Sequence, residues 1–361
     1  MGSAMTNQFA QAAGYSSVLI APALLAWATW LDEPLLVFGA VMLVFPLARV
    51  AFGAVDETGP PVWSEGIATA LDRLPCVYAA VLAGAVLMLL LALSRSEPTM
   101  GAVARWTLSL WVTMVFATCV AHELLHRKRK SDRIVGHLLA GLAGYPMLGY
   151  EHSRHHQRAG SSTSAECPKV TESVWQFAAR RLGAIAHESL GARGLALSGD
   201  SRSPAVRGLR LALATTGVNL ALFGLAAGWP GVLVYTLVIG LVAFAVQLVT
   251  YMQHWGLGDD NIEDAKQAQY GWEDDCQFQA WVTMGLSIHQ AHHRNGSRPY
   301  YRTGITRDSP RPPAGYVVLM FAALFPAVWR HVMAPALVYW RSQPTAPVSA
   351  GRRLACVAFY K

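Results

Sequence analysis

The sequence predicts an all-helical integral membrane protein. Of its 361 residues, 53% are hydrophobic and only 14% are charged, and the mean hydropathy is +0.30. Several apolar runs approach the roughly 20 residues that a helix needs to cross the hydrocarbon core of a bilayer. Lys and Arg gather beside these runs, as they do on the cytoplasmic side of membrane proteins. The net charge of +7 therefore reflects membrane topology, and we expect no nucleic-acid partner.

Four candidate spans occupy the first third of the chain. The turn Asp32-Glu33-Pro34 separates the first two and makes them a hairpin, because a proline can begin the next helix. Residues 54–74 are polar and predict a cytoplasmic loop with a short amphipathic piece. The basic cluster at residues 127–133 follows the fourth span and places that end in the cytoplasm. The four spans are residues 15–31, 35–52, 75–93 and 102–121.

Two more candidate spans, residues 209–227 and 231–252, flank the turn Gly228-Trp229-Pro230. Residues 134–150 are apolar but short, and glycines and a proline interrupt them. A histidine cluster precedes this segment, at residues 122–126, and another follows it, at residues 152–156. Both clusters are expected to reach one site, so we expect a buried or re-entrant segment covered by other protein.

Three other segments are expected to be helical without crossing the bilayer. Residues 172–190 predict an amphipathic helix at the interface, and residues 278–288 a helix leading into a histidine cluster. Residues 316–340 are apolar but contain Pro326 and Pro335, which predicts an interfacial segment or one packed against the bundle.

These expectations combine into one membrane domain, residues 1–361, with about six transmembrane helices and a cytoplasmic, histidine-rich cap. We expect a multi-pass protein of the inner (cytoplasmic) membrane with both termini inside. Residues 1–121 carry the first four transmembrane helices, 122–207 the first two histidine clusters and 208–254 the last two spans. Residues 255–361 form the cap, with the third cluster and an interfacial C-terminal segment.

Nine of the twelve histidines lie in four short segments, each near the end of an apolar stretch. Within three of the segments the spacing is three or four residues, which places side chains on one helix face. Neutral imidazole suits iron, copper, zinc and nickel. Nine imidazoles exceed what one ion accepts, so two ions are expected. The predicted ligands are His122, His126, His152, His155, His156, His254, His289, His292 and His293.

Other interpretations of these residues stay open. His122-Glu123-Leu124-Leu125-His126 matches the H-E-x-x-H motif of zinc proteases, with Glu123 as general base, but a protease would leave the other clusters unexplained. A haem or metal carrier would also use histidines. The five scattered cysteines include no C-x-x-C pair, so no iron–sulfur or thiolate site is expected. His137, His187 and His331 stand alone and are not expected to bind metal.

The order of the motifs resembles that of the membrane di-iron alkane hydroxylases (alkane monooxygenases), within the wider fatty acid desaturase and hydroxylase superfamily. The motifs are H-E-L-L-H-R from His122, E-H-S-R-H-H from Glu151, H-W-G-L from His254 and H-Q-A-H-H from His289. The resemblance covers roughly residues 106–313. It includes Glu166-Cys167-Pro168 and the stretch E-S-V-W from Glu172. The family commonly has Glu and Tyr where this chain has Gln253 and Trp255.

The resemblance implies that the nine histidines bind two non-heme irons, that dioxygen is activated there, and that an unactivated C–H bond of a hydrophobic substrate is hydroxylated. It implies electrons from NAD(P)H through a reductase and a rubredoxin or ferredoxin, since the chain has no dinucleotide or iron–sulfur motif of its own. Glu123 and Glu151 are candidate catalytic residues, because a carboxylate beside a ligand can orient an imidazole. Hydroxylation of benzylic methyl groups, as in xylene and cymene monooxygenases, is an alternative. Desaturation or oxidative decarboxylation of fatty acids to alkenes is another.

Overall fold

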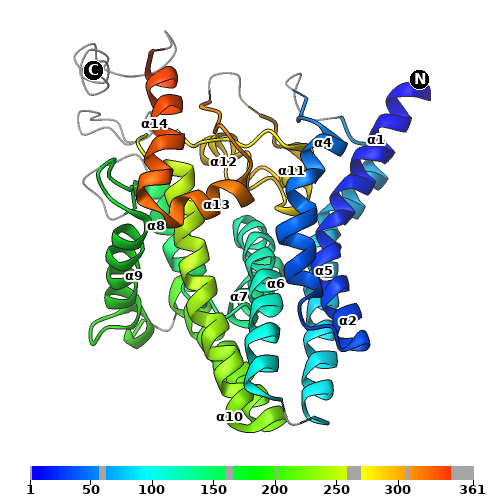
Figure 1. Cartoon of the computed structure of the whole chain (residues 1–361), viewed down its shortest axis with the longest axis vertical. Coiled ribbons are helices and arrows are strands. Elements are labelled where there is room, and N and C mark those ends of the chain that lie inside the picture. Colours follow the sequence, from blue (N-terminus) through cyan, green and yellow to red (C-terminus); the bar gives the residue numbers. More distant parts are fainter. Residues whose placement is uncertain are drawn as a thin grey trace.

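In the computed structural model of the chain, the described residues are 2–56, 62–96, 98–158, 166–200, 202–257, 270–305 and 309–342. Within them the regular structure is helical, and an isolated β-bridge joins Ala54 to Cys276. Long helices form a bundle, and short helices and connections cover one of its ends (Figure 1). The N-terminus and the described end of the last helix both lie at the covered end.

The chain begins with two helical runs that form the predicted hairpin. Asp32 ends the first run in the left-handed conformation, with φ at 55°, which aspartate tolerates better than most residues. The second run is irregular but helical throughout. The first run is α1 (Gly2–Tyr15), η1 (Ser16–Leu19) and α2 (Ile20–Leu31). The second is α3 (Leu36–Gly39), η2 (Ala40–Val44), η3 (Phe45–Leu47) and α4 (Ala48–Phe52).

Helix α5 (Glu65–Leu93) begins ten residues before the predicted span. The prediction of a loop up to residue 74 is therefore wrong from Glu65 onward. Pro75 lies inside the helix and has no N–H to donate to the carbonyl of Leu71. The hydroxyl of Tyr300 donates to that carbonyl instead, at 2.9 Å. A residue more than two hundred positions later thus makes the proline tolerable.

Helix α6 (Met100–His126) is the most buried of the long helices and runs through the centre of the bundle. It is followed by α7 (Lys130–Leu142), a turn at Gly144 with φ at 80°, and α8 (Leu148–Arg158). The 13 residues of α7 are too few to cross a bilayer. The ring centroids of His126, before α7, and His152, on α8, lie 4.6 Å apart. The segment between them therefore begins and ends at the same side of the bundle, as predicted for a re-entrant segment.

Helix α10 (Pro204–His254) is broken at Ala227 and Gly228, where the turn was predicted. The hydroxyls of Thr216 and Tyr235 both donate to the carbonyl of Gly141, at 3.0 and 2.9 Å. In one straight helix two residues this far apart in sequence would be separated by about 28 Å. The two halves of α10 therefore lie side by side, and both pack against the end of α7.

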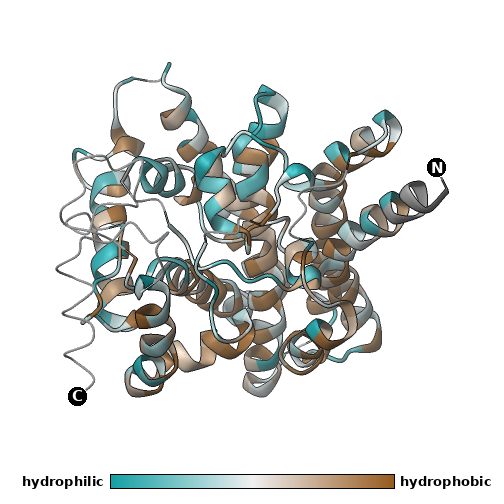
Figure 2. Cartoon of the chain, turned by 90° about the horizontal axis from the view of Figure 1, so that it is seen from above, coloured by the Kyte–Doolittle hydropathy of each residue, from teal (hydrophilic) through white to brown (hydrophobic). Residues whose placement is uncertain are grey.

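Four helices among the described residues are long and apolar enough to span a membrane: Gln8–Leu31, α5, α6 and α10. The chain is a multi-pass membrane protein. The apolar run Leu36–Phe52 is shorter; with it and the two halves of α10, six crossings are compatible with the fold. Viewed from the covered end, the long helices carry mainly apolar residues, and the elements over them carry more of the hydrophilic ones (Figure 2).

The remaining helices build the cover. Helix α9 (Val174–Leu190) begins at a capping box between Ser173 and Gln176, close to the predicted start. The predicted helix at 278–288 is shorter than expected, because positive φ angles at Met284 and Gly285 turn the chain after α11. The cover also includes η4 (Leu195–Leu197), α11 (Gln277–Val282), α12 (His289–Arg294), η5 (Tyr300–Arg302), α13 (Tyr316–Leu324) and α14 (Pro326–Ser342).

Helices α13 and α14 pack against the end of α10. The ring of Trp329 lies 5.2 Å from that of Tyr251 and 5.8 Å from that of Trp255. The predicted packing of residues 316–340 against the bundle is confirmed. Residues 258–269 of the predicted cap and residues 343–361 of its C-terminal segment lie outside the described residues.

The close approach of α7 and α10 makes Gly141 a sensitive position. A Cβ atom there would lie 2.4 Å from the carbonyl oxygen of Ala212 and 2.6 Å from Thr215. We expect Gly141→Ala to destabilise the protein by about 1–3 kcal/mol, measured by thermal unfolding in detergent. Gly84→Ala is the matched control, since that Cβ meets nothing within 4 Å and alanine is the better helix former. Equal melting temperatures of the two variants would contradict the close packing.

Candidate metal centre

All nine predicted histidines meet where four helices end at the covered side of the bundle. Helix α6 brings two on its last turn, α8 brings three, α10 ends on His254, and α12 brings three. They divide into two groups. Within each group, one ring nitrogen from every histidine lies within 4.8 Å of those of the other members. We call them the five-histidine group (His122, His126, His152, His156 and His292) and the four-histidine group (His155, His254, His289 and His293).

The imidazole nitrogens point at one another within each group. In the four-histidine group, Nε2 of His289 lies 2.8 Å from Nε2 of His254 and 2.8 Å from Nε2 of His293. In the five-histidine group, Nε2 of His156 lies 3.0 Å from Nε2 of His292. The groups adjoin, because the ring centroids of His156 and His293 are 4.6 Å apart. The arrangement suits two neighbouring metal ions.

The protonation of these rings also fits metal binding. Burial holds the pKa of His155, His289 and His293 well below the ordinary histidine value, and burial lowers the pKa of His156 to about 4. Nε2 of His122 is buried without a hydrogen-bond partner in the part of the chain that the structure describes. Such an unpartnered nitrogen is costly unless something else satisfies it. Neutral imidazoles with lone pairs to spare are what a metal ion requires.

The two groups differ in their access to the surface. All four members of the four-histidine group are buried, whereas His126, His152 and His156 are partly exposed. These three face an open groove of about 910 Å³, whose walls include Lys130 and Arg133. Solvent therefore reaches the five-histidine group and not its neighbour.

Glu123 does not face either group. Its carboxylate accepts a hydrogen bond from Nε of Arg127 at 2.8 Å and one from the backbone N–H of Tyr300 at 3.5 Å. Arg127 also pairs with Asp72 at 2.5 Å. These contacts tie the end of α6 to α5 and to the loop that carries Tyr300. They place no general base at a metal, as the zinc-protease interpretation would require.

We expect Glu123→Gln to affect stability more than turnover. The amide oxygen can still accept from Arg127, but the charge-assisted bond is lost at a position only 5% exposed, which costs about 1.5–3 kcal/mol. The thermal midpoint and kcat of purified protein are the measurements. A wild-type midpoint combined with a collapse of kcat would instead support the predicted catalytic role of Glu123.

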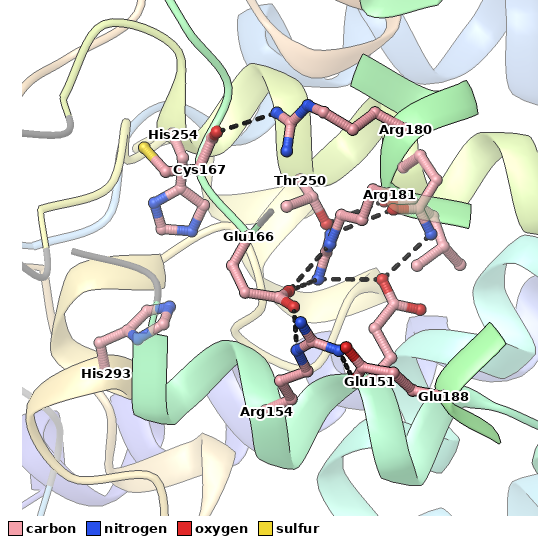
Figure 3. A network of polar contacts seen from close by, with 12 residues as sticks. Glu151, Arg154, Glu166, Cys167, Arg180, Arg181, Glu188, Thr250, His254 and His293 are labelled. Atoms are coloured by element: carbon pink, nitrogen blue, oxygen red, sulfur yellow. Dashed lines mark hydrogen bonds and ion pairs between the residues drawn. The ribbon is translucent and has the colours of Figure 1, made fainter. Parts of the chain in front are cut away.

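Glu151 lies at the edge of the centre and points away from the rings, into a buried polar network (Figure 3). Its Oε1 accepts from the amide of Gln247 at 3.0 Å and pairs with Arg181 at 2.9 Å, and its Oε2 contacts the hydroxyl of Tyr145. Arg181 of this network is not among the site residues predicted from the sequence. It is 1% exposed and lies on the apolar face of α9, four residues from Phe177 and Ile185, and that spacing was readable from the sequence.

A second carboxylate, Glu273, was not predicted as a site residue. It is fully buried, and its Oε1 accepts from the backbone N–H groups of Gln290 and Ala291 at 3.0 and 3.2 Å. These N–H groups belong to the first turn of α12, where a carboxylate is favourable. Glu273 thus fixes the helix that carries three of the histidines.

The remaining singled-out residues belong to neither metal group. Gln253 donates to the carbonyl of Leu286 and to the hydroxyl of Tyr316, both at 3.0 Å. His137 packs against Gly208 and Gly149. His187 and His331 are exposed on the surface. Among the described residues, neither histidine group includes one of these three isolated histidines.

Two neighbouring cavities lie on the bundle side of the histidines, and the smaller one is lined by them. The smaller, of about 70 Å³, is lined by members of both groups, including His122, His155 and His289. The larger, of about 380 Å³, is almost wholly apolar and lies between α6, α10 and α13. Four side chains line both cavities: Val115, Cys119, Val249 and Leu286. An apolar chamber therefore ends beside the metal centre.

Comparison with known proteins agrees with this site. The family model described as fatty acid desaturase matches residues 98–321. The chain is 29% identical over 246 residues to an alkane 1-monooxygenase of Pseudomonas aeruginosa, which covers 64% of this chain and 62% of that protein. It is 26% identical over 331 residues to an alkane 1-monooxygenase of Ectopseudomonas oleovorans, covering 84% and 79%. It is 25% identical over 272 residues to the hydroxylase component of a Pseudomonas putida xylene/toluene monooxygenase, covering 73% and 71%.

A helical membrane bundle with histidine-rich helix ends around a two-metal site defines the class of this protein. The chain belongs to the fatty acid desaturase family, and its relatives within that family include alkane 1-monooxygenases. The resemblance drawn from the four histidine motifs is confirmed.

Proposed function

We propose that the protein is a non-heme di-iron monooxygenase that hydroxylates an unactivated C–H bond, at a terminal or methyl position, of a hydrophobic substrate such as an alkane. The observation that carries the proposal is the junction of two adjacent all-histidine groups with an apolar chamber. The relatives named alkane 1-monooxygenases support the same reaction.

The chamber is suited to hold a hydrocarbon. Its lining includes Phe45, Trp111, Phe244 and Met320 and exposes almost no polar surface. Binding of a hydrocarbon is favoured by roughly 25 cal/mol of free energy for each Å² of apolar surface that is removed from water. A hydrocarbon also has no polar groups whose hydrogen bonds the site would have to satisfy. The side chains shared with the smaller cavity lead the end of such a molecule toward the histidines.

The chain's own residues would hold the metals and exclude water. The nine predicted histidines would ligate two irons, with Glu151 and Glu273 fixing the helices that carry six of them. Iron bound there supplies the redox chemistry that activates dioxygen. The apolar walls keep water away from the buried four-histidine group, and the open groove gives solvent and protons access to the five-histidine group. All nine histidine roles are proposals that metal analysis of alanine variants tests.

Electrons must come from outside, and we propose NAD(P)H, a reductase and a rubredoxin or ferredoxin as their route. The cations that border the open groove, Lys130, Arg133 and Arg207, suit an acidic carrier, since complementary charge speeds encounter. The basic cluster after α6 also supports a cytoplasmic position for the histidines and both termini, in an inner membrane.

Two alternative reactions use the same site. The xylene/toluene relative favours hydroxylation of a benzylic methyl group. The family description favours desaturation, or oxidative decarboxylation, of a fatty acid to an alkene. Each predicts a different product from one substrate mixture.

The test supplies detergent-purified protein with NADH, reductase, carrier and labelled dioxygen, together with octane, xylene and lauric acid. We expect octanol that carries one labelled oxygen atom, and about two irons and no zinc per chain. A methylbenzyl alcohol as the main product would support the benzylic alternative, and an alkene would support desaturation or decarboxylation. Zinc in place of iron, with no oxidised product, would exclude the proposal.

A further inference from the structure

Helix α8 has a special place in the centre, because it supplies ligands to both metal groups. His152 and His156 belong to the five-histidine group and His155 to the four-histidine group. A small rotation or shift of this 11-residue helix would displace ligands in both groups at once. Whatever fixes α8 therefore sets the geometry of the whole centre.

The side chains of α8 that alternate with its histidines are anchors. Glu151 precedes His152, and Arg154 precedes His155. Arg154 pairs through Nε with Glu166 at 2.9 Å and through Nη1 with Glu188. Glu151 is held by the amide of Gln247 and by Arg181. One side of α8 thus carries imidazoles, and its other side is bound into a network of buried charges (Figure 3).

Arg181 connects the two anchors. Its guanidinium donates from Nε to Glu166 at 2.9 Å and from Nη1 to Gln247 at 3.1 Å, and its Nη2 pairs with Glu151 at 2.9 Å. Glu166 in turn pairs with Arg154. A single planar group therefore joins α8 to α9, to α10 and to the segment that carries Glu166. Arginine suits this position because its five N–H donors reach several acceptors in fixed directions.

The burial of this network makes its geometry strict. The side chain of Arg181 is 2% exposed, that of Glu151 3% and that of Glu166 1%. Buried charges are tolerated only when paired and hydrogen-bonded, so these groups cannot drift apart as surface pairs do. The guanidinium also lines the small cavity beside His122, His155 and His289.

We propose that Arg181 is a positioning residue for the metal centre: through Glu151 and Glu166 it fixes α8 so that His155 faces one metal and His152 and His156 face the other. The inference rests on the proposed two-metal site but not on the reaction. Arg181 acts through its carboxylate partners, and its replacement alters the ligands without removing any of them.

The test compares Arg181→Met with Arg180→Met. The control residue is the neighbouring arginine on α9, and it also makes a two-pronged pair with a glutamate, Glu172, at 2.8 Å. That pair does not involve α8. Cobalt(II) binding to the purified apoproteins is titrated against a chelator, and the visible absorption of the cobalt is recorded at saturation.

We expect Arg181→Met to weaken cobalt binding by about 10- to 100-fold, as changes behind metal ligands do, and to alter the absorption band per bound ion. Arg180→Met should match the wild type in both. A loss of general stability alone would lower the melting temperature and leave the saturated spectrum unchanged. An unchanged affinity and spectrum in folded Arg181→Met would overturn the proposal.

If Arg181→Met does not fold, Arg181→Lys and Arg180→Lys take the same roles. A lysine keeps the charge but cannot reach Glu151, Glu166 and Gln247 together, so Arg181→Lys should bind cobalt more weakly than Arg180→Lys; equal binding refutes the inference. A wild type that binds no metal would refute both the metal centre and this inference. A wild type that binds two ions without hydroxylating any substrate would refute only the proposed reaction.

Discussion

Replacing His289 with alanine is expected to reduce the metal content to about one ion per chain. The rate of hydroxylation should fall more than about 100-fold, because replacing a residue that only supports a metal ligand already costs about 10- to 100-fold. His289 is the centre of the four-histidine group, because its Nε2 lies 2.8 Å from those of both His254 and His293. It is 2% exposed, and alanine offers no nitrogen in place of the imidazole. Metal analysis and product formation are the two measurements.

His331→Ala is the control for this prediction, since His331 is exposed on α14 and outside both groups. It should keep the metal content and the activity of the wild type. The five-histidine group should keep its ion in His289→Ala, because none of its members is changed. Two ions per chain in that variant, with activity near that of the wild type, would show that His289 is not a ligand.

The nine histidines could be predicted because their spacing is local. Residues four apart on a helix point in directions about 40° apart, and adjacent ones about 100° apart. The pairs four apart, such as His152 with His156, indeed fall in one group, and His155 falls in the other. Which pairs from different helices share a metal depends on how α6, α8, α10 and α12 are packed, and no pattern within one helix contains that information.

The start of α5 was not predicted, because it also depends on a contact with a distant part of the chain. The polar composition of residues 54–74 indicated a loop, and Pro75 marked the expected beginning of the next helix. The helix continues because the hydroxyl of Tyr300 donates to the carbonyl of Leu71, which the proline leaves without a partner. Glu273 was missed likewise, since it lies in an irregular segment and its role depends on where α12 begins.

Arg181 is a different case, because its signal was present in the sequence. An arginine four residues from both Phe177 and Ile185 lies on the apolar face of an amphipathic helix. A cation in that position is destabilising unless it belongs to a buried ion pair. The candidate partners, Glu151 and Glu166, are also in the sequence, but their meeting depends on the turn between α7 and α8.

The second large effect on turnover is expected from narrowing the passage between the apolar chamber and the small histidine-lined cavity. We expect Val249→Phe to lower kcat/KM for a long alkane by about 10- to 100-fold, equivalent to roughly 1.4–2.7 kcal/mol of lost transition-state stabilisation. Val249 lines both the apolar chamber and the small histidine-lined cavity. The added ring would occupy the route by which the end of a substrate chain reaches the metals. The metal content should not change, since no ligand is altered.

Val218→Phe on the first half of α10 is the matched control, because Val218 is 58% exposed and lines neither cavity. Competition between alkanes of different lengths in one assay gives the sharpest measurement, since it cancels differences in active protein. Shorter alkanes should be affected less than longer ones, because they need less of the chamber behind the narrowed point. If Val249→Phe keeps its fold, its metal and the wild-type preference for chain length, the substrate does not pass between these cavities. The chamber would then have to serve something other than hydrocarbon binding.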